Sequence, residues 1–476
     1  MHLRLTVASP GTAESAADVA VDADPGTTLG EVRADLLAAA RLGAGLPLHV
    51  DGTVLADCAV VGLPPLVTGA LLTAGRRGGS PGRLAGTAQG LLELHVTGGP
   101  DAGAIHPLTP GWHRVGRSAD AEVRLDDVDV SRAHAVLDVG PAGVTVTDCG
   151  STNGTTVGDE RVGDAGAPLA VGAVLRVGSS SLVLRLPTRE AAAVHPTGEG
   201  TVEVNRPPRL VSEHPATCVR LPRAPEAPPR RPFPLLAAFL PLVVAVPMAV
   251  LWSPFALLLG LTTPVMVLGN VISDRRTGRR SHAEAMARHA AATDEAGARV
   301  AALLCAERLH RQLLAPDLAT LATAATTPTA RLWERRPSDA DHLLLRLGTG
   351  TVRSAVRVTR PDGPEGEVTE HPDLSDAPVC VPLATTGVLG VSGPRERLLG
   401  LARSFVVQLA TLHAPGDVRL AVVAAEPEAA DWAWSRWLPH VAPGDVAADQ
   451  PRPPGDAAAA RVAGLVGELE SRRREA

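Results

Sequence analysis

The chain has 476 residues and a formal net charge of −6 at pH 7. This length predicts several domains, and the lack of a basic excess argues against a nucleic-acid partner. Only 2% of the residues are aromatic and none is Tyr, which argues against a surface that stacks bases.

Lysine does not occur in the sequence, so every strongly basic side chain is an arginine. A phosphate-binding loop of the GxxxxGK[ST] type needs its lysine, and we therefore expect no ATPase activity from this chain. The five cysteines form no CxxC pair, which indicates neither a zinc site nor a disulfide framework and suits a reducing cytosol. The histidines are scattered as well, so we predict no catalytic residue, no metal site and no cofactor.

Residues 1–75 have the pattern of a small α/β domain. Polar and apolar residues alternate over His2–Val7, and two further strand candidates follow. Thr28–Ala40 has the pattern of an amphipathic helix, in which Thr28 and Glu31 predict a capping box. The order strand, strand, helix, strand resembles a ubiquitin-like fold. Residues 76–90 are rich in Gly, Ser and Arg and predict a linker.

The segment 91–187 contains three short signatures in fixed order. They are Gly116-Arg117, Ser131-Arg132-Ala133-His134 and Ser151-Thr152-Asn153-Gly154-Thr155. The segments between them are short and mostly apolar or alternating, which indicates strands, and Asn153-Gly154 is a turn signal.

Together these signatures resemble the forkhead-associated (FHA) domain, a β-sandwich that binds phosphothreonine peptides. The resemblance implies that Arg117 and Ser131 grip the phosphate, while Thr152 and Asn153 hold the peptide backbone and the loop. The implied phosphopeptide-binding residues are Arg117, Ser131, Arg132, Thr152 and Asn153. The implied structural residues of the motif are Gly116, His134 and Gly154.

These residue types suit a phosphate on chemical grounds. Phosphothreonine has nearly two negative charges and strong acceptor oxygens. An Arg fork with hydroxyl or amide donors on rigid loops would bind it. The alternative is that the same residues only build the sandwich, because some FHA-like domains have lost phosphate binding.

Residues 188–231 are rich in Pro and Arg and predict an extended tether. Residues 232–273 contain no charged side chain and are rich in Leu, Val and Ala. At about 20 residues per crossing, this run predicts a hairpin of two transmembrane helices, near Leu235–Leu251 and Phe255–Ser273. Arginines flank the run on both sides, which predicts a two-pass protein of the cell membrane with both termini in the cytoplasm and the lipid bilayer as a partner. The alternative is a buried, soluble helical hairpin.

Residues 281–325 are Ala-rich and charged, with apolar residues at helical spacing, and predict a helical stalk. Residues 326–445 predict an α/β domain. Within it, a strand at Val388–Val391, a helix at Arg395–Leu412 and a strand at Leu420–Ala424 predict a parallel-sheet unit. This unit resembles a P-loop unit whose phosphate loop has been lost. A loop and a C-terminal helix are expected over 446–476.

Two strings in this region carry a second resemblance, Leu332-Trp333-Glu334-Arg335-Arg336-Pro337 and Trp437-Leu438-Pro439-His440. They resemble the region that follows the membrane hairpin in FtsK/SpoIIIE-type coupling ATPases of type VII secretion. Some members of that family have FHA domains ahead of the hairpin, and their ATPase modules come after this region.

The predicted fold class is therefore multidomain. It comprises a ubiquitin-like α/β domain, an FHA β-sandwich, a transmembrane hairpin, a helical stalk and an α/β domain. The leading hypothesis is a membrane-anchored, phosphothreonine-reading component of a type VII secretion apparatus, with no motor in this chain. Its expected partners are a phosphothreonine-containing protein, secretion-system subunits and other copies of itself. The alternative is a stand-alone phosphopeptide adaptor tethered at the membrane.

Overall fold

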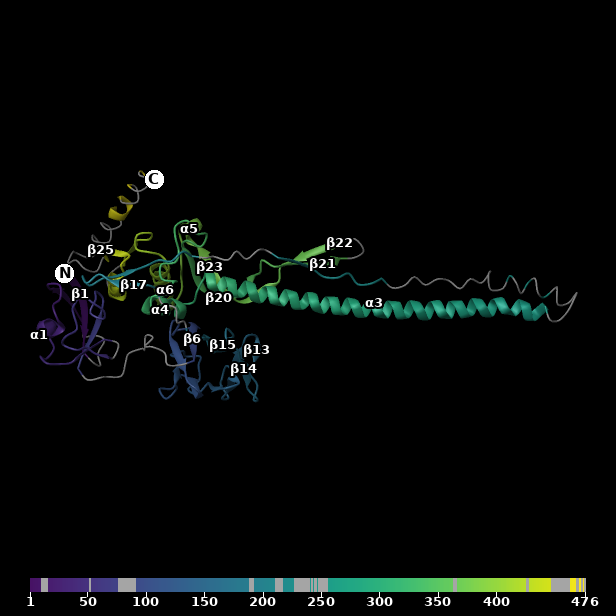
Figure 1. Cartoon of the computed structure of the whole chain (residues 1–476), viewed down its shortest axis with the longest axis horizontal. Helices are drawn as coiled ribbons and strands as arrows, with labels where there is room; N and C mark the ends of the chain where they lie inside the picture. Colours follow the sequence, from purple (N-terminus) through teal and green to yellow (C-terminus); the bar gives the residue numbers. More distant parts are fainter. Residues whose placement is uncertain are drawn as a thin grey trace. The chain divides into compact units, whose positions relative to one another are not determined.

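A computed structural model describes residues 1–9, 16–50, 53–75, 91–187, 192–209, 217–226, 240, 243, 246, 256–362, 366–424, 428–446, 463–467, 471 and 474 (Figure 1). The chain divides into two compact units. The first unit comprises Met1–Ser212, Gln312–Gly350 and Pro378–Ala476, and the second comprises Glu213–Arg311 and Thr351–Ala377. The predicted linker at 76–90 and most of the predicted C-terminal helix lie outside the described residues.

The N-terminal part of the first unit is a mixed five-stranded sheet with one helix, α1 (Leu29–Ala39). Its strands, in the sheet order β2-β1-β5-β3-β4, are β2 (Ala17–Asp22), β1 (His2–Ala8), β5 (Leu71–Ala74), β3 (Leu48–Val50) and β4 (Thr53–Val54). Helix α1 buries Leu29, Leu36 and Leu37. The carboxylate of Glu31 accepts a hydrogen bond from the Thr28 N–H at 2.6 Å, which confirms the predicted capping interaction.

A β-sandwich follows in the first unit. One sheet has the order β14-β11-β10-β8-β9, and the other has the order β13-β12-β15-β16-β6-β7. The strands of the first sheet are β8 (Gly111–Gly116), β9 (Val123–Arg124), β10 (Ala135–Gly140), β11 (Gly143–Asp148) and β14 (Ala167–Leu169). Those of the second are β6 (Leu92–Gly98), β7 (Ile105–Leu108), β12 (Thr155–Val157), β13 (Glu160–Arg161), β15 (Val174–Val177) and β16 (Ser180–Arg185).

Alternation along these strands builds one core between the two sheets. In β10, Ala135, Leu137 and Val139 are buried while Asp138 is exposed, and they join buried residues of the other sheet such as Leu182 in a single cluster. This alternation is what a half-buried antiparallel sheet requires.

The strand register brings three loops to one end of the first sheet. Ala135, at the start of β10, lies opposite Val115 near the end of β8 and opposite Asp148 at the end of β11. The loops that follow β8, precede β10 and follow β11 therefore leave the sheet at the same end. These loops contain the three sequence signatures.

The rest of the first unit is assembled from short elements. They are β17 (Val194–Pro196), β18 (Val202–Val204), α4 (Leu318–Thr326), α5 (Leu383–Thr386), α6 (Arg395–Leu412), β24 (Leu420–Val422), the 3-10 helix η2 (Glu428–Trp437) and β25 (Val441–Val446). Strands β20 (Leu344–Arg353) and β23 (Asp373–Pro382) pair with each other. The predicted helix Arg395–Leu412 is confirmed, whereas the strand predicted at Val388–Val391 is wrong. Those residues form an exposed loop, in which Val388 is 85% exposed.

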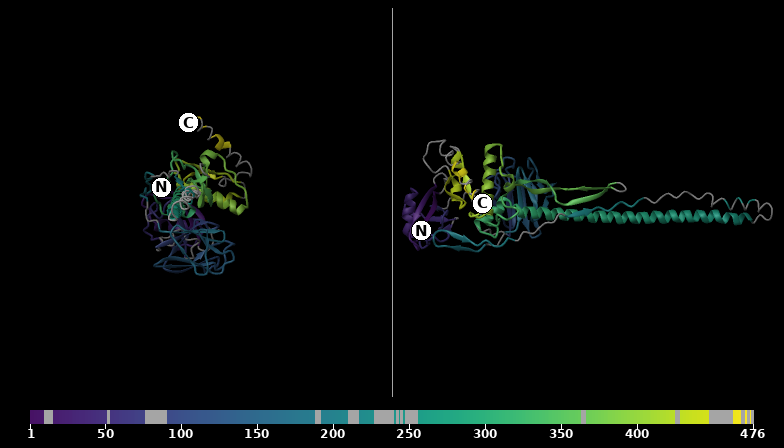
Figure 2. Two further views of the ribbon diagram at one scale, coloured as in Figure 1. Left: turned by 90° about the vertical axis from the view of Figure 1, so that its right-hand side faces the viewer. Right: turned by 90° about the horizontal axis from the view of Figure 1, so that it is seen from above.

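The second unit contains most of helix α3 (Ala256–Leu314), which is one unbroken helix and is seen along its length in Figure 1 and in the right-hand view of Figure 2. It also contains a three-stranded sheet of β19 (Cys218–Arg220), β21 (Arg357–Asp362) and β22 (Gly366–Glu370). The buried carboxylate of Glu307 on α3 pairs with Arg311 at 2.7 Å and accepts the Ala355 N–H at 2.9 Å.

The predicted transmembrane hairpin and the two-pass membrane localisation are contradicted. Over the described part of the chain, no helix is both long enough and apolar enough to cross a bilayer. The first predicted span, Leu235–Leu251, lies almost entirely outside the described residues.

Candidate functional site

A pocket of about 700 Å³ opens among the three loops at the end of the first sheet of the sandwich. Its lining residues are Arg114, Arg117, Ser118, Asp120, Ala121, Ser131, Arg132, Ala133 and Thr152. Four of the five residues predicted to bind phosphopeptide, Arg117, Ser131, Arg132 and Thr152, therefore line the same pocket. The fifth, Asn153, does not line the pocket.

The loop after β8 is joined to the loop before β10 by backbone hydrogen bonds. The N–H of Arg117 donates to the Ser131 carbonyl at 3.0 Å, and the N–H of Ser118 donates to the Arg132 carbonyl at 3.1 Å. Gly116 makes this approach possible, because a Cβ at this position would collide with the carbonyl oxygen of Arg132. The guanidinium of Arg117 is thereby carried on a loop with a fixed backbone.

Ser131 and Thr152 come from different loops and meet at the pocket. The Ser131 hydroxyl accepts the Thr152 N–H at 3.2 Å, and its oxygen lies 3.5 Å from the Thr152 hydroxyl. Because both side chains end in a hydroxyl and both line the same pocket, they present two adjacent donors to a ligand.

His134 connects the loop before β10 to the loop after β11. Its side chain is fully buried; Nδ1 lies 3.1 Å from the Ser131 nitrogen and Nε2 lies 3.2 Å from the Gly154 carbonyl oxygen. The Ser131 N–H can only donate, so Nδ1 must accept and the ring proton must be on Nε2. A neutral histidine therefore connects the second signature to the third.

Asp148 anchors the third signature, and the sequence analysis missed it. Its carboxylate accepts hydrogen bonds from the Ser151 N–H at 2.8 Å and from the hydroxyls of Ser151 and Thr155, each at 2.6 Å. Burial alone would raise the pKa of Asp148, but these hydrogen bonds outweigh it and lower the pKa to about 2. The signal in the sequence was an Asp three residues before a Ser in a turn.

The Asn153 side chain points to a neighbouring turn, not to the pocket, and it ties the loop after β11 to that turn. Its side-chain N–H donates to the Asp129 carbonyl at 2.8 Å. The turn that contains Asp129 is held in its own right by the buried Asp127, whose carboxylate accepts the N–H of Asp129 at 3.0 Å and the Ser180 hydroxyl at 2.7 Å. Asp127 is a second supporting residue that the sequence patterns did not single out.

The three arginines that line the pocket differ in whether a carboxylate already binds them. Arg114 is occupied, because its guanidinium forks onto Glu122 at 3.2 and 3.1 Å, and hydrogen bonding from Arg114 lowers the pKa of Glu122 to about 2. Arg117 and Arg132 form no ion pair with any residue that the structure describes, and the Arg117 Nε donates to the Val130 carbonyl at 3.4 Å. Two guanidinium groups and two hydroxyls therefore surround the pocket, an arrangement suited to binding a compact anion.

Comparison with known proteins gives two kinds of relatives. Residues 95–188 match a family model described as the inner membrane component of T3SS, cytoplasmic domain. The chain is 30% identical over 200 residues to the ESX-4 secretion system protein EccC4 of Mycobacterium tuberculosis, a match that covers 38% of this chain and 16% of EccC4. It is 35% identical over 123 residues to the ESX secretion system protein EccC of Thermomonospora curvata, covering 23% of this chain and 9% of that protein. The chain thus spans a small part of the length of these relatives.

Solved structures similar to the chain are FHA domains. One, from a study of phosphothreonine-dependent FHA domain interactions, is 34% identical, with 20% of this chain and 97% of that chain covered and a TM-score of 0.19. Another is the FhaA FHA domain complexed with the intracellular domain of Rv3910, at 35% identity, 20% and 99% coverage and a TM-score of 0.18.

Proposed function

We propose that the β-sandwich binds a phosphothreonine-containing peptide in the pocket formed by the three loops. The single observation that carries this proposal is the convergence of Arg117, Ser131 and Thr152 on one pocket that Arg132 also lines. A phosphate group has enough charge and enough acceptor oxygens to use all of these donors together.

Each residue has a distinct part in this proposal. Arg117 and Ser131 bind the phosphate oxygens, and Thr152 and Arg132 bind the phosphate or the peptide next to it. Asn153 keeps the third loop in place through the Asp129 carbonyl. Gly116, His134 and Gly154 are structural, since they allow or make the contacts between the loops.

At the level of the chain, we propose a regulatory and assembly component of a type VII secretion apparatus. The support is the similarity to EccC proteins of ESX secretion systems. Its partners would be a phosphothreonine protein and other secretion-system subunits. With no lysine in the sequence, this polypeptide would contribute recognition rather than ATP hydrolysis.

The test uses the full chain and an oriented library of phosphothreonine peptides, with the same library unphosphorylated. We expect binding only to the phosphorylated library. Arg117→Ala should remove about 1.5–3 kcal/mol of binding free energy, roughly a 10- to 100-fold rise in Kd. Arg124→Ala is the matched control, because Arg124 is exposed on β9 and outside the pocket. Equal binding of both libraries by the wild-type chain would refute the proposal.

A further inference from the structure

The segment 188–231 is predicted from the sequence to be an extended tether, but its residues 192–209 belong to the first compact unit and contact other parts of it. Strands β17 and β18 form an antiparallel hairpin. At the base of the hairpin, the Asn205 N–H donates to the Ala193 carbonyl at 3.0 Å, and the Ala192 N–H donates to the Pro328 carbonyl at 2.6 Å. The chain that leaves this hairpin, residues 205–209, then delivers two arginines to the Trp333–Asp341 loop.

Arg206 binds the backbone of that loop. Its Nε donates to the Trp333 carbonyl at 2.8 Å, and its Nη2 donates to the Arg335 carbonyl at 3.1 Å. Its Nη1 forms an ion pair with Asp417 at 3.0 Å. Trp333 has a φ of +58°, a left-handed backbone conformation that is unfavourable for a bulky residue, so this loop conformation needs contacts of this kind to persist.

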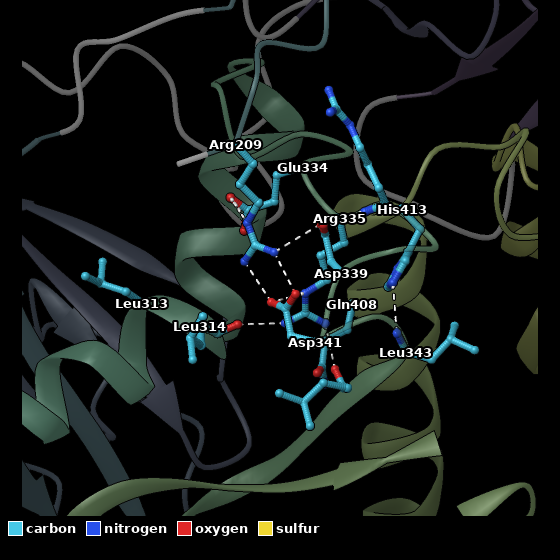
Figure 3. A network of polar contacts seen from close by, with 12 residues as sticks. Arg209, Leu313, Leu314, Glu334, Arg335, Asp339, Asp341, Leu343, Gln408 and His413 are labelled. Carbon is cyan, nitrogen blue, oxygen red and sulfur yellow. Dashed lines mark hydrogen bonds and ion pairs between the residues drawn. The ribbon is translucent and has the colours of Figure 1, made fainter. Parts of the chain in front are cut away.

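Arg209 binds the carboxylates of the same loop. Its two terminal nitrogens fork onto the two oxygens of Asp341 at 2.6 and 2.7 Å, and Glu334 and Asp339 lie at 3.7 and 3.4 Å (Figure 3). Only 11% of the Arg209 side chain is exposed. A bidentate pair with this degree of burial is the stronger kind of ion pair.

Asp341 also holds Arg335, which is 1% exposed, at 3.2 Å (Figure 3). The Arg335 guanidinium donates to the carbonyls of Leu314 and Leu344, each at 2.7 Å. Asp341 therefore binds both Arg209 and Arg335. We call the buried Arg335 side chain with these partners the Arg335 hub, because it connects the end of α3 to the start of β20.

Four carboxylates form ion pairs with Arg206 or Arg209, namely Glu334, Asp339, Asp341 and Asp417. Without Arg206 and Arg209, the cations that the described ion pairs leave beside them are Arg331, paired with Glu334 at 3.1 Å, and the buried Arg335. Half-buried carboxylates without a partner are costly.

We propose that the carboxylate cluster of Glu334, Asp339, Asp341 and Asp417 is an intramolecular receptor for the arginine-bearing segment 205–209 of the same chain. The segment is a latch: it fixes the conformation of the Trp333–Asp341 loop and, through Asp341, the Arg335 hub. Opening and closing of this latch would change the order of the loop without any change in the phosphopeptide pocket.

The test is amide hydrogen exchange of the full chain, comparing the double variant Arg206→Ala/Arg209→Ala with the wild type. We expect exchange of the Asn205 amide, the hydrogen-bonded amide of the segment 205–209, and exchange in 333–345 to become about tenfold faster or more, because charge-assisted bonds that close the loop are lost. Arg220→Ala is the matched control, an exposed arginine on β19, and should leave both segments unchanged.

Three outcomes would overturn the latch. They are exchange of the Asn205 amide in the wild type at the rate of an unstructured peptide, unchanged exchange of 333–345 in the double variant, and protection that rises with protein concentration. The last result would mean that the arginines come from a second copy. Phosphothreonine-library binding by the double variant, expected to equal that of the wild type, keeps the outcome separate from the proposed function.

Discussion

Gly116 is the residue on which the geometry of the pocket depends most directly. Gly116→Ala would place a methyl group against the Arg132 carbonyl, which belongs to backbone and cannot turn aside. We expect the loop before β10 to shift, with a loss of about 1–3 kcal/mol of folding stability and a loss of phosphopeptide binding. Urea unfolding and peptide titration of the variant measure the two effects.

Gly140→Ala is the matched control for that substitution. Gly140 lies on β10, and a Cβ there would meet no heavy atom within 4 Å. Its stability should remain within about 0.5 kcal/mol of the wild type. If Gly116→Ala bound the phosphorylated library as tightly as Gly140→Ala does, the loop contact would not matter for recognition.

Asp148 makes the stability of the third loop dependent on pH. Hydrogen bonds from Ser151 and Thr155 lower its folded-state pKa to about 2, from the ordinary value of 3.8. Because the folded pKa lies below the unfolded one, the stabilisation is complete above about pH 5 and is lost as the pH falls towards 2. The shift corresponds to about 2 kcal/mol.

Asp148→Asn tests this linkage. We expect the variant to be about 2 kcal/mol less stable than the wild type at pH 7, and the difference to shrink steadily between pH 5 and pH 2. Asp138→Asn, an exposed position on β10, provides the comparison. A difference between wild type and Asp148→Asn that stayed constant over this pH range would show that charge is not what Asp148 contributes.

At the level of elements, local patterns predicted some parts of the chain and not others. Helix α6 was predicted with its bounds, because an amphipathic run after Pro394 is a local signal. The apolar run Val388–Val391 was predicted as a strand, but a strand needs a partner edge, and the residues instead form an exposed loop. Sequence periodicity contains no information about such a partner.

In the candidate site too, some residues could be predicted from the sequence and others could not. Arg117, Ser131 and Thr152 could be predicted because their motifs and order resemble a known family. Asp148 had a local signal that was missed, because its donors Ser151 and Thr155 lie only a few positions further along the chain. The role of Arg209 depends on Asp341, 132 positions further along the chain. A contact at that separation has no local pattern in a single sequence.

The Arg335 hub shows how one buried side chain connects several elements. The Arg335 guanidinium forms an ion pair with Asp341 and donates hydrogen bonds to two backbone carbonyls. A lysine ammonium cannot reproduce this planar geometry. We expect Arg335→Lys to lower the free energy of unfolding by about 2–4 kcal/mol, measured by urea denaturation. Arg336→Lys, at the exposed neighbouring position, should be nearly neutral, and equal losses in both variants would contradict the hub.

At the scale of the whole molecule, the side-chain cations of the pocket, the latch and the hub are all arginines. Since no lysine occurs, the pocket, the latch and the hub all use guanidinium groups, which bind carboxylates and phosphates as forks rather than as point charges. This composition favours fixed, oriented contacts with anions. It leaves the chain without the residue that a nucleotide-hydrolysing P-loop requires.

The chain should therefore release no phosphate from Mg·ATP. The turn before α6, the nearest counterpart of a phosphate loop, ends at Pro394, which has no N–H to donate, and Arg395 beside it is engaged by Asp431 at 2.6 Å. We expect phosphate release by the full-length chain at the level of buffer alone, measured colorimetrically over hours. Hydrolysis that survives a second purification step and falls in a Ser392→Ala variant would contradict this, because it would place a working nucleotide site at the exposed loop between α5 and α6. Phosphate release at the level of buffer alone by both the wild type and Ser392→Ala would agree with the proposed role in binding a phosphopeptide.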